Sequence, residues 1–222
     1  MATELPRTPG LNRDAVSELL RGLPEDPPPA LDPYLDAATR CFVRHGIERT
    51  TVQDVASEMG FNRATIYRQV GTIEQQIQLL AARDVRRHLS SIPARVAGLT
   101  GPDLLVELAA IGVEDARAHP VLAKILADEP RLVGTILERH IGKVRDQVVP
   151  VLASLCQTGM DTGQLTPMDP VVLASWIVRI VVTLVVLEPE TELRAYLREL
   201  LVPALSPAAA PAQAPTQTPA FT

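Results

Sequence analysis

Apolar residues recur every three or four positions along most of this chain, the spacing of one face of an α-helix. Between residues 50 and 70 they form two short stripes, made of Val52, Val55, Ala56 and Met59 and then of Ile66 and Val70. Gly60 lies between the stripes, at a position where a positive φ is cheap only for glycine. The pattern therefore predicts two short helices joined by a tight turn.

Polar residues stand where these helices would begin. Thr51 is a good N-cap, Asp54 completes a capping box three residues later, and Asn62 is the expected N-cap of the second helix. A preceding helix is expected from Asp32 to about His45, with Asp32 as its N-cap, proline in its first turn and Gly46 after its end. The three helices together predict a helix-turn-helix domain.

The chain beyond residue 70 continues with helical spacing, broken at glycine and proline. A fourth helix is expected over 72–90, with an inward face made of Ile77, Leu80, Ala81, Val85 and Leu89. Further helices are expected over 104–119 and 120–126, from 130 onward, and over 170–187 and 190–205, with a loop over 159–166. Pro150 is expected to kink or divide the helix that starts at 130, because proline removes a helix hydrogen bond.

Five motifs keep a fixed spacing across the first helices: Phe42…Gly46, Thr50-Thr51-Val52, Val55-Ala56, Gly60 and Arg63-Ala64-Thr65-Ile66-Tyr67. With these motifs, residues 32–91 resemble the DNA-binding domain of TetR-family transcriptional regulators. The resemblance implies an all-α fold, with an N-terminal three-helix helix-turn-helix domain followed by a larger helical ligand-binding and dimerisation domain. Two positions depart from the family pattern. Val70 and Ile73 stand near positions where the family usually has an aromatic residue and a lysine, so one phosphate contact is lost.

Arginine in the major groove favours guanine O6 and N7, and glutamine favours adenine N6 and N7. Thr51, at a helix N-terminus, can donate to a phosphate, and the resemblance implies that the Tyr67 hydroxyl does so as well. The alternative is that the arginines merely form a solvated face. Nine residues are expected to contact DNA: Thr50, Thr51, Asn62, Arg63, Ala64, Thr65, Tyr67, Arg68 and Gln69.

The formal net charge of −5 is unusual for a DNA-binding protein. Residues 32–91 carry eight arginines against seven acidic residues, so the acidity lies in the flanking regions. Affinity is therefore expected from a few placed contacts and two copies of the domain. Aromatic residues make up only 3% of the chain, which predicts an aliphatic core.

Nothing in the sequence favours an enzyme, since it has no glycine-rich phosphate loop, nucleophile elbow or metal-ligand spacing, and its four histidines are scattered. No metal or cofactor is expected. Cys41 and Cys156 lie far apart among apolar residues and are expected to be reduced core residues, with a redox-sensing thiol as the alternative. The polar, proline-rich start of the chain is unlike a signal peptide, so a cytoplasmic location is expected.

Residues 171–187 are nearly apolar all round. A membrane span is one interpretation, but the segment is short for a span and Arg179 would lie near its middle. The favoured interpretation is a helix buried against its own domain and a second subunit. The resemblance implies that this helix and the last one form a four-helix dimer interface, over about 170–205. Arg179 would then need a buried carboxylate or helix-end carbonyls as its partner.

Four parts of the chain are expected. Residues 1–30 are a proline-rich extension, disordered or with a short helix around 11–23, and residues 31–75 form the helix-turn-helix DNA-binding domain. Residues 76–205 form the ligand-binding and dimerisation domain, whose first helix links the two domains, and residues 206–222 form a disordered tail.

The resemblance implies a small molecule bound between helices of the larger domain. Candidate lining residues are Leu108, Ile111, Leu126, Leu132, Ile136, Leu152, Trp176 and Ile180, which suit a hydrophobic ligand or plain core packing.

The expected function is a homodimeric, ligand-responsive transcriptional regulator, a repressor released from double-stranded operator DNA by a hydrophobic small molecule. One alternative is a DNA-binding regulator that is independent of ligand or activates transcription. An alternative from another class is a membrane-associated interaction protein that uses residues 171–187.

Overall fold

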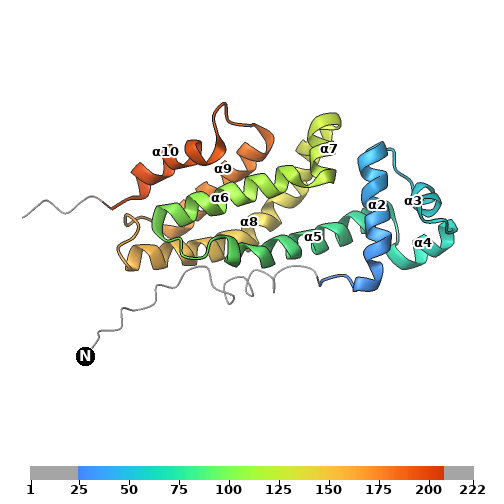
Figure 1. Ribbon diagram of the computed structural model, residues 1–222, viewed down its shortest axis with the longest axis horizontal. Helices are drawn as coiled ribbons and strands as arrows, with labels where there is room; N and C mark the ends of the chain where they lie inside the picture. The colour runs from blue at the N-terminus through green and yellow to red at the C-terminus, as the bar shows by residue number, and fades with distance from the viewer. Residues whose placement is uncertain (1–24, 208–222) are drawn as a thin grey trace, which may run out of the picture.

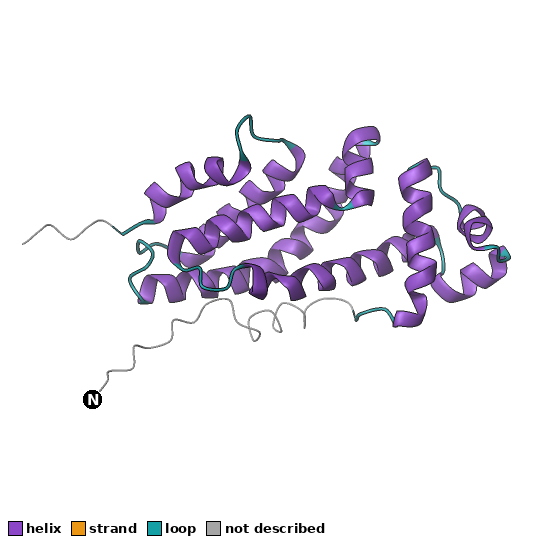
Figure 2. Ribbon diagram, viewed as in Figure 1, coloured by secondary structure: helices purple, strands orange, loops and turns teal. Residues whose placement is uncertain are grey.

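The computed structural model describes residues 25–207, which contain helices and no strand (Figure 2). The predicted all-α fold is confirmed for this part of the chain. The extension around residues 11–23 and the tail from 208 lie outside the described residues. In the described part of the chain, a 3₁₀ turn, η1 (Pro29–Leu31), precedes nine helices: α2 (Asp32–His45), α3 (Val52–Met59), α4 (Arg63–Val70), α5 (Ile73–Arg95), α6 (Gly101–Ala118), α7 (Pro120–Asp128), α8 (Pro130–Asp161), α9 (Pro170–Val186) and α10 (Leu193–Leu205).

The helices divide into two groups along the long axis of the molecule (Figure 1). Helices α2, α3 and α4 lie at one end, and α6, α8, α9 and α10 form a bundle toward the other end. Helix α5 runs from the first group along the bundle, and α7 lies at the junction, packed against α2, α6 and α8.

The two groups have separate hydrophobic cores. The N-terminal core contains fully buried Leu35, Phe42 and Ile66, and α7 contributes Val121 and Ile125 to it. A C-terminal core is built from α6, α8, α9 and α10, and its largest fully buried side chains include Leu105, Leu197 and Leu201. Helix α7 therefore contributes to the core of the helix-turn-helix unit, although it follows α6 in the chain and also packs against α6 and α8.

A close contact ties the α7–α8 corner to the helix-turn-helix unit. The backbone N–H of Ile47 donates to Glu129 Oε2 at 3.1 Å. Gly46, with φ 83°, makes this approach possible, because a Cβ there would lie 2.3 Å from Glu129 Oε1. Glycine is thus favoured at residue 46 by its positive φ, and its lack of a Cβ lets the Glu129 carboxylate approach the backbone.

Helix α2 spans the predicted residues, but Asp32 is not its N-cap. Leu31 precedes the helix as N-cap residue, and no described side chain caps it. The carboxylate of Asp32 instead accepts hydrogen bonds from Arg83 at 3.3 Å and Arg87 at 2.9 Å. Asp32 therefore fastens α2 to α5.

Helix α5 is longer than predicted, and it continues past Pro93 to Arg95. Its buried face also differs from the predicted one, since Ala81 and Val85 are exposed while Ala82 and Arg83 are buried. Arg83 donates to Asp32, Asp36 and Asp84, all at 3.3 Å or less. The hydrophobic pattern missed this face because three carboxylates make burial of an arginine possible there.

Helix α8 runs without division through Pro150 and ends at Asp161, so the prediction of a loop from 159 was wrong for its first residues. Asp169 caps α9 as predicted, accepting from the N–H groups of Val171 and Val172.

Cys41 and Cys156 are free and buried in different cores. Burial raises the pKa of both thiols, that of Cys156 to about 11.

Within residues 25–207, no helix is long and apolar enough to cross a membrane. The same residues contain no cluster of three or more His, Cys, Asp or Glu side chains that could hold a metal ion.

Candidate nucleic-acid interface

The predicted caps of α3 and α4 are confirmed. Thr51 and Asp54 form a reciprocal capping box at the start of α3, and Gly60 ends that helix with φ 70°. Asn62 Oδ1 caps α4 by accepting from the N–H of Thr65 at 2.8 Å. Each helix has only eight residues. Helices this short are marginal alone, so the caps and the shared core hold them in place.

Helix α4 is anchored on one side and open on the other. Ile66 and Val70 are buried in the N-terminal core. The opposite face is exposed over residues 62–64 and 67–69, and the Tyr67 side chain is 55% exposed. Of the nine predicted contact residues, this face brings together seven: Asn62, Arg63, Ala64, Thr65, Tyr67, Arg68 and Gln69.

Thr50 and Thr51 lie in different environments although they are neighbours. Thr50 is 5% exposed, and its hydroxyl donates to the carbonyl of Gly46 at 2.6 Å. Its side chain is therefore buried in the connection between α2 and α3 and is not part of the exposed face. The prediction that the Thr50 side chain contacts DNA is thus corrected. Thr51 is exposed, but its N–H and hydroxyl both donate to Asp54 Oδ2, at 2.8 and 2.7 Å. These hydrogen bonds lower the pKa of Asp54.

The arginines of this unit are of two kinds. Arg40 and Arg44 on α2 donate to Glu58 at 2.7 and 2.9 Å, and these hydrogen bonds lower the pKa of the Glu58 carboxyl. Arg63 and Arg68 on α4 are exposed, and no acidic group of the described residues lies within ion-pair distance of either. Two uncompensated guanidinium groups therefore project from α4.

Comparison with known proteins agrees with this geometry. The family model for bacterial regulatory proteins of the tetR family matches residues 35–75, which span the helix-turn-helix unit. The helix-turn-helix unit is therefore similar to the DNA-binding domain of TetR-family regulators. The chain is also similar to the HTH-type transcriptional repressor AcnR of Corynebacterium diphtheriae, with 28% identity over 154 residues that cover 57% of this chain and 75% of AcnR.

Solved structures with TetR-type folds extend the likeness over most of the chain. The fatty acid degradation regulator FadR from Bacillus halodurans has 20% identity and a TM-score of 0.58, covering 79% of this chain and 94% of FadR. AibR, in complex with isovaleryl coenzyme A and operator DNA, has 17% identity and a TM-score of 0.54, covering 76% of this chain and 96% of AibR. The fold of the C-terminal helices is thus shared with TetR regulators.

Those predicted ligand-lining side chains that the structure describes lie in several different packing environments. Ile111 is fully buried in a small cluster with Ile92, Val96 and Leu104. Leu152 belongs to the C-terminal core, and Leu108 and Ile180 pack against it. Leu132 packs against the N-terminal core, Trp176 is 41% exposed on α9, and the side chain of Ile136 is outside the described set.

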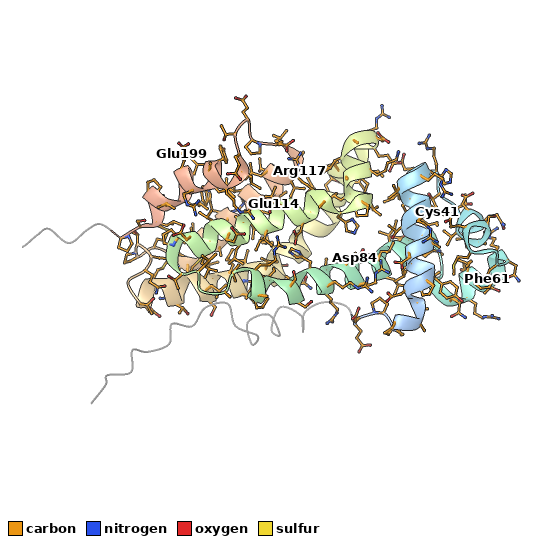
Figure 3. All side chains as sticks on the ribbon, in the orientation of Figure 1. Cys41, Phe61, Asp84, Glu114, Arg117 and Glu199 are labelled. Carbon is orange, nitrogen blue, oxygen red and sulfur yellow. The ribbon has the colours of Figure 1, made fainter. Side chains whose placement is uncertain are left out.

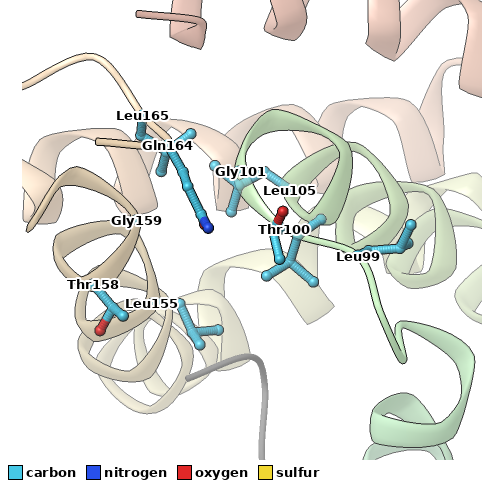
Figure 4. A pocket seen from close by; sticks show the side chains of 10 residues that line it. Leu99, Thr100, Gly101, Leu105, Leu155, Thr158, Gly159, Gln164 and Leu165 are labelled. Carbon is cyan, nitrogen blue, oxygen red and sulfur yellow. The ribbon is translucent and has the colours of Figure 1, made fainter. Parts of the chain in front are cut away.

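Of the predicted lining residues, Leu126 borders an open cavity of about 740 Å³ between α7 and α8. The described residues that line this cavity are Arg117, Ala123, Leu126, Ala127, Val133, Gly134, Leu137 and Val186. Figure 3 shows Arg117 at the end of α6 beside α7. A second pocket, between the start of α6 and the end of α8, has only about 20 Å³, and the Gln164 side chain points into it (Figure 4). It is too small for more than a water molecule.

Proposed function

We propose that this chain is a dimeric transcriptional regulator of the TetR family, and that it inserts the exposed face of α4 into the major groove of double-stranded operator DNA. The observation that carries the proposal is the pair Arg63 and Arg68, exposed without an acidic partner among the described residues on an eight-residue helix. The presence of operator DNA in the AibR complex, a protein of the same fold, supports the same use of the unit here.

The exposed side chains of α4 have distinct chemical roles in this proposal. Arg63 and Arg68 suit guanine edges, and Gln69 suits adenine. The Tyr67 hydroxyl is available for a phosphate. The donors of Thr51 reach a phosphate only by leaving Asp54, so the capping box and a phosphate compete for them.

A second copy of the chain is the proposed partner of α9. Apolar side chains are exposed on this helix at Val172, at Trp176 four residues later and at Val186 fourteen residues later, with Val172 65% exposed. Arg179 lies in the same stripe and donates to Ser175 Oγ at 3.0 Å. Exposed apolar side chains along one face of a helix mark an interaction surface. The stripe consists of Val172, Trp176, Val186 and the following Leu187.

Light scattering tests this assembly. The wild-type protein is expected to be a dimer, and Val172→Glu is expected to dissociate it because the charge would be buried at the interface. Val85→Glu is the matched control, since Val85 is an exposed valine on α5, away from the stripe. A wild-type monomer at micromolar concentration would contradict the dimer.

The repressor form of the proposal rests on the α7–α8 corner. Leu132 and Val133 of α8 pack against the N-terminal core, and Glu129 accepts from Ile47 N–H in the α2–α3 connection. A hydrophobic molecule that moves α7 against α8 would thus disturb the helix-turn-helix unit. In a dimer, this would change the distance between the α4 helices of the two subunits, which must be about 34–36 Å to match successive major grooves. A regulator of this kind acts in the cytoplasm, on operator DNA.

Selection of genomic DNA fragments by the purified protein tests the function as a whole. Recovered fragments are expected to share a palindromic or near-palindromic motif, as two-fold symmetry requires. A library without enrichment at any salt concentration would overturn the DNA-binding assignment. An effector that lowers DNA affinity must lose affinity by the same factor when operator DNA is bound.

A further inference from the structure

The open cavity between α7 and α8 has a wall of mixed chemistry. Six of its described lining residues present aliphatic side chains, Gly134 presents none, and Arg117 presents a guanidinium group. The volume of about 740 Å³ lies within the range of small-molecule pockets, about 300–1,000 Å³. The site thus combines a large apolar surface with one fixed positive charge.

Arg117 already holds a carboxylate. Its Nη1 donates to Glu188 Oε1 at 3.1 Å, and the Glu188 side chain, in the connection after α9, is 75% exposed. An ion pair so open to water contributes little to stability. A second carboxylate that approaches from the cavity can therefore replace Glu188 at small cost, while Glu188 returns to solvent.

We propose that this cavity binds an aliphatic monocarboxylate, with its head group on Arg117 and its chain against Leu126, Val133 and Leu137. This inference rests on the proposed function, because it names the chemical class of the effector. Hydrogen bonds between guanidinium and carboxylate are charge-assisted and fix the head group. Burial of the chain supplies the rest of the affinity, in proportion to the apolar area removed from water.

The cavity lies next to the contacts that reach the DNA-binding unit. Val133 borders the cavity and also packs against the N-terminal core. Glu129, which binds the Ile47 N–H, stands at the corner between the two helices that form the walls. A carboxylate in this cavity therefore bears on α7 and α8 at the point where they touch the helix-turn-helix unit.

Two glycines of α8 offer a matched pair of filling variants. A Cβ at Gly134 or at Gly142 meets no other atom within 4 Å, so both positions accept a larger side chain. Gly134 lines the cavity, whereas Gly142, eight residues further along the helix, is not among the lining residues. Leucine at either position raises helix propensity equally, so only the occupied cavity distinguishes the two variants.

Calorimetric titration of the full-length protein with decanoate and with decanol, in the absence of DNA, tests the proposal. Decanoate is expected to bind more tightly than decanol. Arg117→Gln is expected to weaken decanoate binding by about 10- to 100-fold, the usual effect of losing a charged hydrogen bond, while decanol binding stays unchanged. Glu188→Gln is expected to tighten decanoate binding by removing the competing carboxylate. Gly134→Leu is expected to abolish binding of both probes, and Gly142→Leu to retain both.

Equal affinity of the wild type for decanoate and decanol would overturn the proposal. So would an Arg117→Gln variant that binds decanoate like the wild type, or a Gly134→Leu variant that retains binding. If Arg117→Gln fails to fold, the response to Glu188→Gln still decides the role of the guanidinium, and an unchanged decanoate affinity there contradicts it. Because no DNA is present, a failure here is separate from a failure of the DNA-binding assignment.

Discussion

The helix-turn-helix unit and the C-terminal bundle differ in the side chains that they leave free to bind a partner. On α4, Arg63 and Arg68 stand in solvent without an acidic partner among the described residues. In the bundle, the arginine at the start of α10 is tied to acids on a neighbouring helix. Arg194 on α10 donates to Glu107 and Glu114 on α6, and these hydrogen bonds raise the pKa of Arg194 and lower that of Glu107.

The helix-turn-helix unit also exposes Val43, Phe61 and Tyr67, but α9 exposes the largest set of apolar side chains among the described helices. Helix α9 leaves Val172 and Trp176 in solvent, although α9 packs against α6 and α8 on its other side. The helix-turn-helix unit thus has unpaired positive charge at its surface, and the bundle has an exposed apolar helix face. The two regions are therefore suited to different partners. Free guanidinium groups suit a polyanion, and a free aliphatic stripe suits a second copy of the same stripe.

The largest expected effect tests where the boundary between the two regions lies. Ile125 on α7 is 4% exposed in the N-terminal core, so Ile125→Ala is expected to cost about 2–5 kcal/mol. Hydrogen exchange is expected to show the loss of protection in α2, α3 and α4. Ile177→Ala on α9, 3% exposed in the C-terminal core, is the matched control and is expected to affect the bundle. Protection in α2–α4 that is insensitive to Ile125→Ala would place α7 with the bundle instead.

A smaller effect is expected at Asp84, which joins the two regions (Figure 3). It accepts from Arg83 at 2.8 Å and lies 3.0 Å from His119 Nε2 at the start of α7. Asp84→Asn is expected to cost about 1.5–3 kcal/mol at neutral pH, the range for hydrogen bonds to charged groups. Asp146→Asn, in an exposed ion pair with Arg145, is the control and is expected to cost less than about 1 kcal/mol.

The pH dependence of stability checks the same residue. Burial alone would raise the pKa of Asp84, but the hydrogen bonds with His119 and Arg83 outweigh it and leave the pKa below its usual value. Asp84 therefore stabilises the fold at pH above its unfolded pKa of about 4, and this stabilisation is lost as the pH falls through the lower folded pKa. Thermal unfolding between about pH 5 and pH 2 is expected to be less pH-dependent in Asp84→Asn than in the wild type. If the variant and the wild type show the same pH dependence of thermal unfolding, ionised Asp84 does not stabilise the fold.

The smallest effect concerns the helix caps. Thr51→Ala is expected to cost about 0.5–2 kcal/mol, because the Asp54 N–H loses its acceptor. Thr100 precedes α6 at the same N-cap position, but its side chain caps no N–H of the described residues. Thr100→Ala is therefore expected to leave the free energy of unfolding nearly unchanged. If chemical denaturation gives the same loss of unfolding free energy for both variants, the side-chain cap of Thr51 does not stabilise α3.

Features set by nearby residues were predicted from the sequence, and features set by distant residues were not. The caps at Thr51 and Asn62 and the turn at Gly60 depend on partners within four residues, so their residue types sufficed. Asp32 has the right type for an N-cap, but its partners Arg83 and Arg87 lie more than 50 residues away. The sequence offered no sign of that contact.

The candidate site shows the same limit. Thr50 and Thr51 are identical in type, and only the packing of α2 against α3 makes one a buried corner residue and the other an exposed cap. Among the aliphatic residues of the bundle, Ile111 in a packed core and Leu126 beside an open cavity have the same helical spacing. Arg117 was missed as a lining residue because the pattern considered was apolar, although a lone cation in the last turn of α6 was a visible signal.

The proposed contact between DNA and the unpaired arginines of α4 can be tested directly. The measurement is DNA affinity as a function of salt concentration for matched arginine variants. Wild-type affinity is expected to fall steeply with salt, because bound arginines release counterions from the phosphates. Arg63→Ala and Arg68→Ala are each expected to cost about 1–3 kcal/mol and to relax sequence preference if they read bases. Arg44→Ala removes the same charge from α2, where Glu58 already neutralises it, and is expected to bind nearly as the wild type does. Equal losses in all three variants, or none, would contradict the claim.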